Sequence, residues 1–572
     1  MHDVASGQPP LRRVILGRFK VLAEVTRKLA EESIIVSGNV VDVLNTTIYP
    51  AELRIEGGRI ADITTKHDAD PWYILPGFID AHLHVESSML TPSEFARAAV
   101  MHGTVAAICD PHEIANVLGT DGVRFMLEDA AKSPFRFCFG APSCVPASPF
   151  ETSGAILGAE EVSSLLARNN IGFLGEVMNV PAVLRDDPDM MAKIDAAKRL
   201  KKPIDGHCPG LSGSALEAYV AAGISTDHEC VTLDEALEKL ALGMKILMRE
   251  GSAAKNLDHL LPLFERHSWD CMFCSDDAHP DDLYTGHINR LVKRAVRLGV
   301  DFMKVLRAAC VNPVLHYGLD AGLLRRGDRA DFIVVNNMTD FGVLATVIGG
   351  YIVAENGMTQ LPRIDCTPVN RFVATPVHPG VFALPARGTT VRVIEAADSQ
   401  INTGSGTAAA KVVDGHAVAD PERDLLKIAV INRYEQKPPA VAFIRGFGLK
   451  RGAIASSVAH DAHNIVCVGT SDEEMARAVN LVIEAKGGLS AVGAGEETLL
   501  PLPVAGLMSD GHYAEVARTS ARLNAHAGRL GSTLRAPFMT LSFMCLTVIP
   551  SLKLSDRGLF DGEKFEFTDL FL

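Results

Sequence analysis

Short apolar runs alternate with longer amphipathic segments from about residue 74 to residue 277. The segment 214–222 has apolar residues at helical spacing, and Gly223 follows as a plausible stop. This alternation predicts βα units on a parallel sheet. Eight apolar runs occur in order: ILPGFIDAHLH, TVAAICD, FRFCFGAP, GFLGEV, PIDGHC, ISTDHE, KILMRE and CMFCSDD. Eight repeats in about 250 residues predict a TIM (β/α)8 barrel; a doubly wound open sheet is the alternative.

The flanks of this region have a different pattern. Residues 34–44 and 51–63 read as strands with a hairpin turn at Gly57 and Gly58, and residues 322–336 and 343–357 again read as strands. We expect both flanks to form one composite β-domain, preceded by a short helix at 22–32. The rest of the chain is too long for a tail and predicts an α+β domain, with a loop or hairpin at 402–410. The predicted domains are 1–74, 75–320, 321–370 and 371–572.

Composition narrows the class of protein. Of 572 residues, 47% are hydrophobic and 22% are charged, which is typical of a globular chain. The net charge of -14 argues against nucleic acid or an anionic membrane as partner. The 11 scattered cysteines show no disulfide framework, and neither a signal-peptide core nor a membrane-spanning run is visible. We therefore expect a cytoplasmic protein with a small-molecule substrate, and a homo-oligomer, assumed to be a dimer.

His82 and His84 stand at the end of the first barrel run. In a strand, residues two apart point to the same face, so the two imidazoles converge. At the carboxyl end of a barrel strand that face is the barrel mouth, where TIM-barrel active sites lie. The pair therefore predicts the start of a metal site, although a His-x-His sequence also arises by chance in loops.

Further ligand-type residues end other predicted strands. Taken singly, each of them is more often structural, as a core histidine or a helix cap. Together with the His-x-His pair they predict a metal site at the mouth of the barrel. The additional residues are Glu176 on the fourth run, His207 on the fifth, His228 on the sixth, and Asp276 and Asp277 on the eighth.

This order of ligands resembles the amidohydrolase superfamily, as do the lead-in LPGFIDAHLH and the later strand GDRADFIVV. Residues 84–119, 273–283, 457–469 and 538–562 are more specifically similar to the adenine deaminases. The similarity covers nearly the whole chain, including a C-terminal domain that other amidohydrolases lack.

The resemblance implies a binuclear centre. His82 and His84 would hold one metal and His207 and His228 the other. Glu176 would bridge them, where many relatives carry a carbamylated lysine, and Asp276 would complete the centre. Two Mn²⁺ or Fe²⁺ ions per subunit are the family expectation, and Zn²⁺ also suits nitrogen and carboxylate ligands.

The implied reaction is hydrolytic deamination of adenine to hypoxanthine and ammonia, as in purine salvage. A hydroxide held by the metals attacks C6, and Asp276 takes the proton of the water and returns it to the departing amine. Asp110 or Glu113, in the CDPHE segment with His112, would protonate ring N1. Asp110 has a competing interpretation as a helix cap before Pro111.

Other interpretations remain open at this point. The chain could be a cyclic-amide hydrolase of the dihydroorotase or hydantoinase kind, a deaminase of a related purine, or a scaffold that has lost catalysis. Cys271 and Cys274 form a Cys-x-x-Cys, but residues three apart in a strand face opposite sides. The cluster His460, Asp461, His463 and Asn464 could be a second metal site, a wall of the active site or a polar turn.

Overall fold

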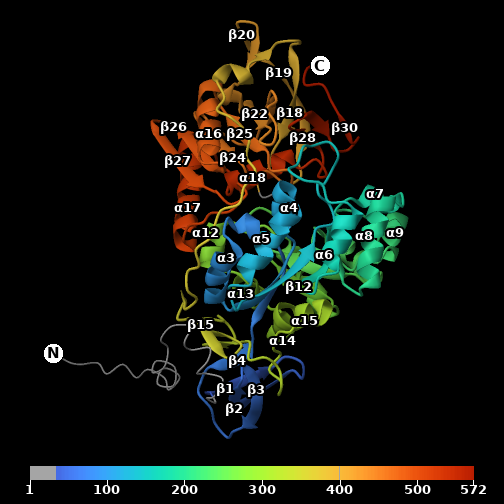
Figure 1. Ribbon diagram of the computed structural model, residues 1–572, viewed down its shortest axis with the longest axis vertical. Coiled ribbons are helices and arrows are strands. Elements are labelled where there is room, and N and C mark those ends of the chain that lie inside the picture. The colour runs from blue at the N-terminus through green and yellow to red at the C-terminus, as the bar shows by residue number, and fades with distance from the viewer. Residues whose placement is uncertain (1–33, 399) are drawn as a thin grey trace, which may run out of the picture.

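The computed structural model describes residues 34–398 and 400–572, so the helix predicted at 22–32 lies outside the described residues. Figure 1 shows three tiers: a small β-domain at the bottom, an α/β domain in the middle and the C-terminal residues at the top. The chain passes from the bottom tier to the middle, back to the bottom, and then to the top. The middle tier is therefore in contact with both of the others.

Strands from both flanks of the middle tier share one sheet. Its order is β16-β15-β14-β13-β4-β1-β2-β3, and antiparallel pairing of β13 with β4 joins the two segments. Glu56 pairs with Arg59 across the predicted turn, which confirms the hairpin at Gly57 and Gly58. The strands are β1 (Ile34–Asp42), β2 (Thr47–Glu56), β3 (Arg59–Thr65), β4 (Tyr73–Pro76), β13 (Phe332–Val335), β14 (Val343–Ile348), β15 (Tyr351–Glu355) and β16 (Met358–Thr359).

The middle tier has a TIM-like α/β fold. Parallel strands form a five-stranded sheet, β5-β6-β7-β8-β9, and a three-stranded sheet, β10-β11-β12. A parallel bridge between Leu83 and Asp276 connects the end of β5 with the residues after β12. The strands are β5 (Phe78–Leu83), β6 (Thr104–Cys109), β7 (Arg136–Ala141), β8 (Ile171–Val177), β9 (Ile204–Gly206), β10 (Thr226–Asp227), β11 (Lys245–Arg249) and β12 (Cys271–Cys274).

The first predicted run is wrong in one respect. The run from Ile74 to His84 was expected to form one strand, but it divides into β4 of the β-domain and β5 of the five-stranded parallel sheet. Gly77 stands at the division, where a Cβ atom would lie 2.3 Å from the Val105 side chain. Close packing against β6 therefore requires glycine there, and the chain changes sheets at this residue.

Helices lie between the barrel strands, as the alternating pattern predicts. The segment expected at 214–222 is helix α9, and Gly223 follows it with a φ of +105°. The helices of this region are α3 (Pro92–Ala99), α4 (His112–Leu118), α5 (Thr120–Ala130), α6 (Ala159–Leu166), α7 (Val180–Leu184), α8 (Pro188–Arg199), α9 (Gly213–Ala221), α10 (Leu233–Ala241), α11 (Leu257–Leu260), α12 (Pro280–Thr285), α13 (Ile288–Arg297), α14 (Phe302–Leu306) and α15 (Asn312–Tyr317).

The top tier is built on a second eight-stranded sheet, in the order β19-β18-β23-β22-β25-β24-β26-β27. Residues 402–410, predicted as a loop or hairpin, contain edge strand β19, which pairs with β18 along its whole length. The backbone supplies this pairing, so small side chains do not prevent it. The main elements are β18 (Thr390–Glu395), β19 (Gly404–Ala409), β22 (Leu426–Ile431), β23 (Ala440–Arg445), β24 (Ala453–Ser456), β25 (Ile465–Gly469), α16 (Asp472–Glu484), β26 (Gly488–Gly493), β27 (Glu496–Pro501), α17 (Tyr513–Leu530) and α18 (Pro537–Ser542).

Two small sheets complete this tier: β17-β21-β20 and β28-β29-β30. The strands of the small sheets are β17 (Leu384–Pro385), β20 (Lys411–Val413), β21 (His416–Val418), β28 (Leu552–Ser555), β29 (Gly558–Asp561) and β30 (Glu566–Phe567).

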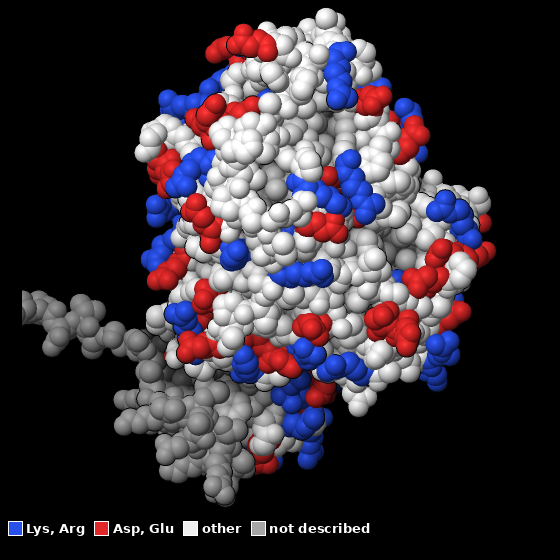
Figure 2. All heavy atoms as spheres, turned by 45° about the horizontal axis from the view of Figure 1, so that its top comes forward, with Lys and Arg blue, Asp and Glu red and all other residues white. Residues whose placement is uncertain are grey.

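The surface carries mixed charge, and Figure 2 shows lysines and arginines interspersed with acidic residues on the face it displays. Within the described ranges, no helix has both the length and the apolar character needed to cross a membrane.

Candidate metal centre

The six residues predicted as metal ligands converge at the carboxyl ends of the parallel strands of the middle tier. All six are buried, with at most 9% of each residue exposed. Because parallel strands end at the same edge, residues far apart in the chain meet there. His82 lies on β5 and His84 directly follows it, Glu176 lies on β8, His207 follows β9, His228 follows β10, and Asp276 lies two residues after β12.

The Glu176 carboxylate lies between two pairs of histidines. Its Oε1 is 3.3 Å from Nε2 of His84 and 3.8 Å from Nε2 of His82. Its Oε2 is 2.9 Å from Nδ1 of His207 and 3.4 Å from Nε2 of His228. Each oxygen therefore faces one pair of imidazoles, which is the arrangement that a bridging carboxylate requires.

Asp276 also approaches the first pair of histidines, His82 and His84. Its Oδ1 is 3.2 Å from Nε2 of His84 and 3.7 Å from Nε2 of His82. Its backbone N–H donates to the carbonyl of His82 at 3.0 Å, so the end of β5 and the residues after β12 are tied together. Asp276 has a φ of +54°, an uncommon conformation for a residue with a side chain. Such conformations cluster at functional sites.

The ligand set fits divalent metal ions by spacing and by hydrogen bonding. Two ligand atoms each about 2.1 Å from one ion lie about 3.0–3.4 Å apart, close to the separations around Glu176. Several buried ring nitrogens have no hydrogen-bond partner among the residues that the structure describes. They include both ring nitrogens of His82 and Nε2 of His207. Triads whose ligand atoms lie within 4.8 Å of one another include His82–Glu176–His228, His82–His84–Asp276, His84–His112–Glu176, His207–His228–Glu229 and His112–Glu113–Asp461.

The electrostatics favour an ionised Glu176 carboxylate and a neutral His82. Burial alone would raise the pKa of Glu176, but the hydrogen bond from His207 and the neighbouring imidazoles hold that pKa well below its usual range. Burial holds the pKa of His82 well below its usual value. The other three histidines differ, because the neighbouring carboxylates outweigh burial and raise the pKa of His84 and His207, and raise that of His228 to about 9. A bound cation would compete with these protons for the ring nitrogens.

Asp110 contacts the centre through the backbone. Its Oδ2 accepts a hydrogen bond from the backbone N–H of Glu176 at 2.9 Å, and its carbonyl lies 3.0 Å from Nδ1 of His84. The alternative of a helix cap does not describe it, because α4 begins after Pro111 and shows no side-chain cap. Contacts of this kind orient ligands around a metal.

Glu113 is held by the C-terminal tier. One carboxylate oxygen accepts a hydrogen bond from Nδ1 of His460 and the other from Nε2 of His463. His112 lies beside them, with its Nε2 3.6 Å from Glu113 and 3.9 Å from Asp461. The cluster at 460–464 therefore lies in a wall of the candidate site, one of the three alternatives left open by the sequence.

The centre contains two residues that sequence reasoning missed. Glu229 lies 3.5 Å from Nδ1 of His207 and 3.4 Å from Nε2 of His228. Arg249, at the end of β11, bridges Glu229 and Asp276, with 2.5 Å contacts to each. Glu229 directly follows His228 and ends the sixth predicted run, and Arg249 is the last but one residue of the seventh. Their positions at strand ends were the available signal.

We expect Arg249→Met to destabilise the metal-free protein by about 3–5 kcal/mol, because it leaves two buried carboxylates without their shared cation. Urea unfolding followed by circular dichroism measures this change. Arg124→Met, at an exposed ion pair on α5, is the control and should change stability by less than about 1 kcal/mol. A loss of stability for Arg249→Met as small as that of the control would contradict the role of Arg249 as the shared cation of the two buried carboxylates.

The cavity at this centre is small, about 30 Å³. One side carries the strand-end residues, and the other carries Ile401, His460, Asp461, Phe543 and Leu546 from the C-terminal tier. The apolar stretch 541–549 thus contributes two side chains to the site. Both tiers are needed to enclose the cavity.

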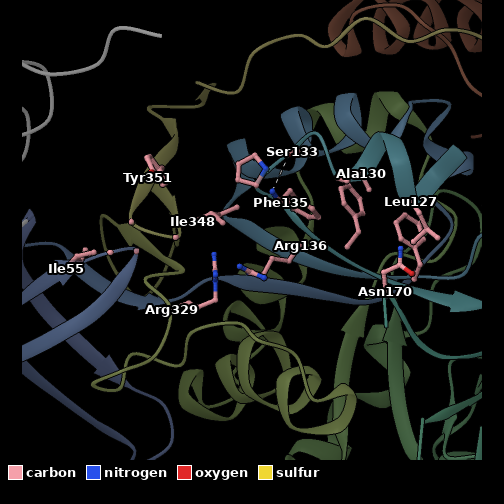
Figure 3. A pocket seen from close by; sticks show the side chains of 18 of the residues that line it. Ile55, Leu127, Ala130, Ser133, Phe135, Arg136, Asn170, Arg329, Ile348 and Tyr351 are labelled. Atoms are coloured by element: carbon pink, nitrogen blue, oxygen red, sulfur yellow. Dashed lines mark hydrogen bonds between the residues drawn. The ribbon is translucent and has the colours of Figure 1, made fainter. Parts of the chain in front are cut away.

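A larger cavity of about 680 Å³ lies elsewhere, between the small β-domain and the start of β7. Figure 3 shows Arg136 and Arg329 there. Both arginines contact Asp331, at 3.2 Å and 3.4 Å. The lining includes none of the six predicted ligands, so the size of a cavity does not identify the candidate metal centre.

Cys271 and Cys274 are also outside the candidate metal centre. They belong to different core clusters, as expected for opposite faces of β12.

Comparison with known families agrees with this geometry. Residues 73–353, which form the TIM-like fold with its ligand-type residues at the strand ends, match the model of the Amidohydrolase family, so the chain is an amidohydrolase-class protein. Residues 400–566 match the adenine deaminase C-terminal domain. An adenine deaminase of Salinibacter ruber is 56% identical over 539 residues, which cover 94% of this chain and 99% of the relative. One of Parabacteroides distasonis is 49% identical over 541 residues, which cover 95% and 99%. The chain belongs to the adenine deaminase family.

Proposed function

We propose that the protein hydrolyses adenine to hypoxanthine and ammonia and thereby serves purine salvage. The observation that carries the proposal is the 56% identity to a relative named adenine deaminase over 94% of this chain. The geometry supports it, because a carboxylate between two histidine pairs is suited to hydrolysis assisted by two metals. A cyclic-amide hydrolase would share such a centre, but the match to the adenine deaminase C-terminal domain favours a purine substrate.

Two divalent ions are part of this proposal. His82 and His84 would hold one ion and His207 and His228 the other, with Glu176 between them and Asp276 beside the first pair. Nitrogen and carboxylate ligands without thiolate suit Mn²⁺ or Fe²⁺, and also Zn²⁺. When bound, such ions supply the Lewis acidity that makes water nucleophilic at neutral pH.

The chain's own residues would move the protons. Asp276 takes a proton from the attacking water and returns it to the departing amine at C6. Glu113 lines the same cavity as Asp276, whereas Asp110 is not part of the lining, so Glu113 is the better placed partner for ring N1.

The domain arrangement is also proposed. We infer one closed eight-stranded barrel from the two parallel sheets and the Leu83–Asp276 bridge. The boundaries 1–74, 75–320, 321–370 and 371–572 remain predictions, as does a homodimer. Together they describe a catalytic barrel carried between two smaller domains.

Ammonia release tests the proposed function. Metal-free protein reloaded with Mn²⁺ is given adenine, adenosine, guanine or dihydroorotate in parallel. We expect ammonia from adenine alone, and no activity before the metal is restored. Turnover of dihydroorotate instead would assign the protein to the cyclic-amide hydrolases, and turnover of guanine would assign another purine.

A further inference from the structure

The larger cavity, of about 680 Å³, lies between the small β-domain and the amino ends of β7 and β8. Asn170 lines it and directly precedes β8, whereas Glu176 of the candidate metal centre lies near the carboxyl end of the same strand. The two cavities are therefore at opposite ends of the parallel strands. Cavities of about 300–1,000 Å³ are the size that small-molecule ligands occupy in proteins.

Two arginines of this cavity share one carboxylate. Arg136 begins β7 and Arg329 precedes β13, and Figure 3 shows their side chains next to one another. The Nε atoms of both arginines approach the same oxygen, Oδ2 of Asp331, at 3.2 Å and 3.4 Å. The other oxygen of Asp331, Oδ1, accepts a hydrogen bond from the backbone N–H of Gly349 at 2.6 Å. Asp331 therefore offers a single oxygen to two cations.

Most N–H groups of these two guanidinium groups have no acceptor. Across residues 34–398 and 400–572, the one hydrogen bond that they donate runs from Nε of Arg136 to Asp331, and the buried Nε of Arg329 has no hydrogen-bond partner. Asp320 is 3.9 Å from Nη1 of Arg329, beyond hydrogen-bonding distance. Its side chain is 65% exposed and also faces Arg59 at 4.0 Å, so it does not supply the missing acceptor.

The cavity thus carries an excess of positive charge that water reaches only in part. The side chains of Arg136 and Arg329 are 26% and 27% exposed. Burial lowers the pKa of Arg136 and the neighbouring Arg329 lowers it further, although Asp331 acts in the opposite direction. A partly buried cation that lacks its own counter-ion is costly, and a bound anion would remove that cost. Guanidinium groups match the oxygens of phosphate in two-pronged hydrogen bonds.

We propose that this cavity binds a small organic phosphate, with the phosphate group between Arg136 and Arg329. A phosphate monoester has three terminal oxygens, so it can accept hydrogen bonds from both guanidinium groups at once, whereas a carboxylate has only two. The organic part lies against the remaining lining, which is mostly aromatic and aliphatic. That lining includes Ile55, Leu127, Phe135, Phe137, Ile348 and Tyr351. The proposal does not depend on the reaction at the metal centre.

Isothermal titration calorimetry of the metal-loaded full chain with phenyl phosphate and with inorganic phosphate tests the proposal. We expect phenyl phosphate to bind at least about tenfold more tightly, because its ring buries apolar surface that inorganic phosphate lacks. Arg329→Lys keeps a positive charge beside Asp331, so the fold is preserved. It loses the planar fork and should weaken phenyl phosphate by about tenfold or more, and Arg329→Met should weaken it by about 100-fold.

Two control variants locate the bound phosphate. Arg325→Lys makes the same change at an arginine that pairs with Asp328 at 3.0 Å and does not line the cavity, so it should keep the wild-type affinity. Glu176→Gln alters the metal centre, which could also attract phosphate, and should keep that affinity too. Affinity that Glu176→Gln loses and Arg329→Lys retains would place the phosphate at the metal centre and overturn the proposal. The absence of saturable binding, or equal affinity for inorganic phosphate, would also overturn it.

Discussion

Replacing Glu176 with glutamine is expected to abolish ammonia release from adenine, with a loss in kcat/KM of at least about 10³-fold. The carboxylate faces a histidine pair through each oxygen, at 3.3 Å to His84 and 2.9 Å to His207. A neutral amide offers one oxygen and one NH2 group, so it cannot provide a ligand oxygen to both histidine pairs. Metal content measured by plasma emission spectrometry should fall together with activity.

Glu94→Gln is the control for this variant. Glu94 is also buried, but it lies on α3 and pairs with Arg97 at 2.7 Å, outside the candidate centre. The control should lose stability and keep its metal and its activity. A Glu176→Gln variant that retained two ions and near wild-type turnover would exclude a bridging role for this carboxylate.

Replacing Asp276 with asparagine is expected to lower kcat by about 10²–10⁴-fold, the range attributed to a positioned general base. The amide oxygen can still approach His84, so we expect metal content to stay above half that of the wild type. Stopped-flow ammonia assays on metal-loaded protein measure the loss at saturating adenine.

The comparison of KM with kcat distinguishes proton transfer from binding for Asp276. A proton-transfer role predicts a fall in kcat with little change in KM. A rise in KM with unchanged kcat would show that Asp276 acts on substrate binding. Complete metal loss would show that the loss of a ligand, not the loss of a base, accounts for the lower activity.

The sequence was informative where a local pattern determines geometry. Period-two spacing placed His82 and His84 on one face, and the alternation of runs placed Glu176 at a strand end. The sequence was less informative where packing between neighbouring strands determines the structure. Gly77 divides one predicted strand into two, and glycine is required there because of the Val105 side chain of β6.

The C-terminal contacts could not be derived from the sequence. Glu113 and His460 are separated by 347 positions, and their pairing depends on how two tiers pack. No periodicity or spacing encodes such a contact, so the cluster at 460–464 allowed three interpretations. Glu229 and Arg249 could not be identified for a related reason. Acidic and basic residues at strand ends are common, and only the folded structure shows that Glu229 faces two of the histidines and that Arg249 contacts Glu229 and Asp276.

The most direct test of the binuclear centre is a titration of metal-free protein with Mn²⁺ while ammonia release from adenine is recorded. Our account predicts that activity rises until two equivalents per chain are bound and then stays constant, and that Glu176→Gln shows no such rise. A plateau at one equivalent, or full activity without added metal in chelator-treated protein, would contradict it.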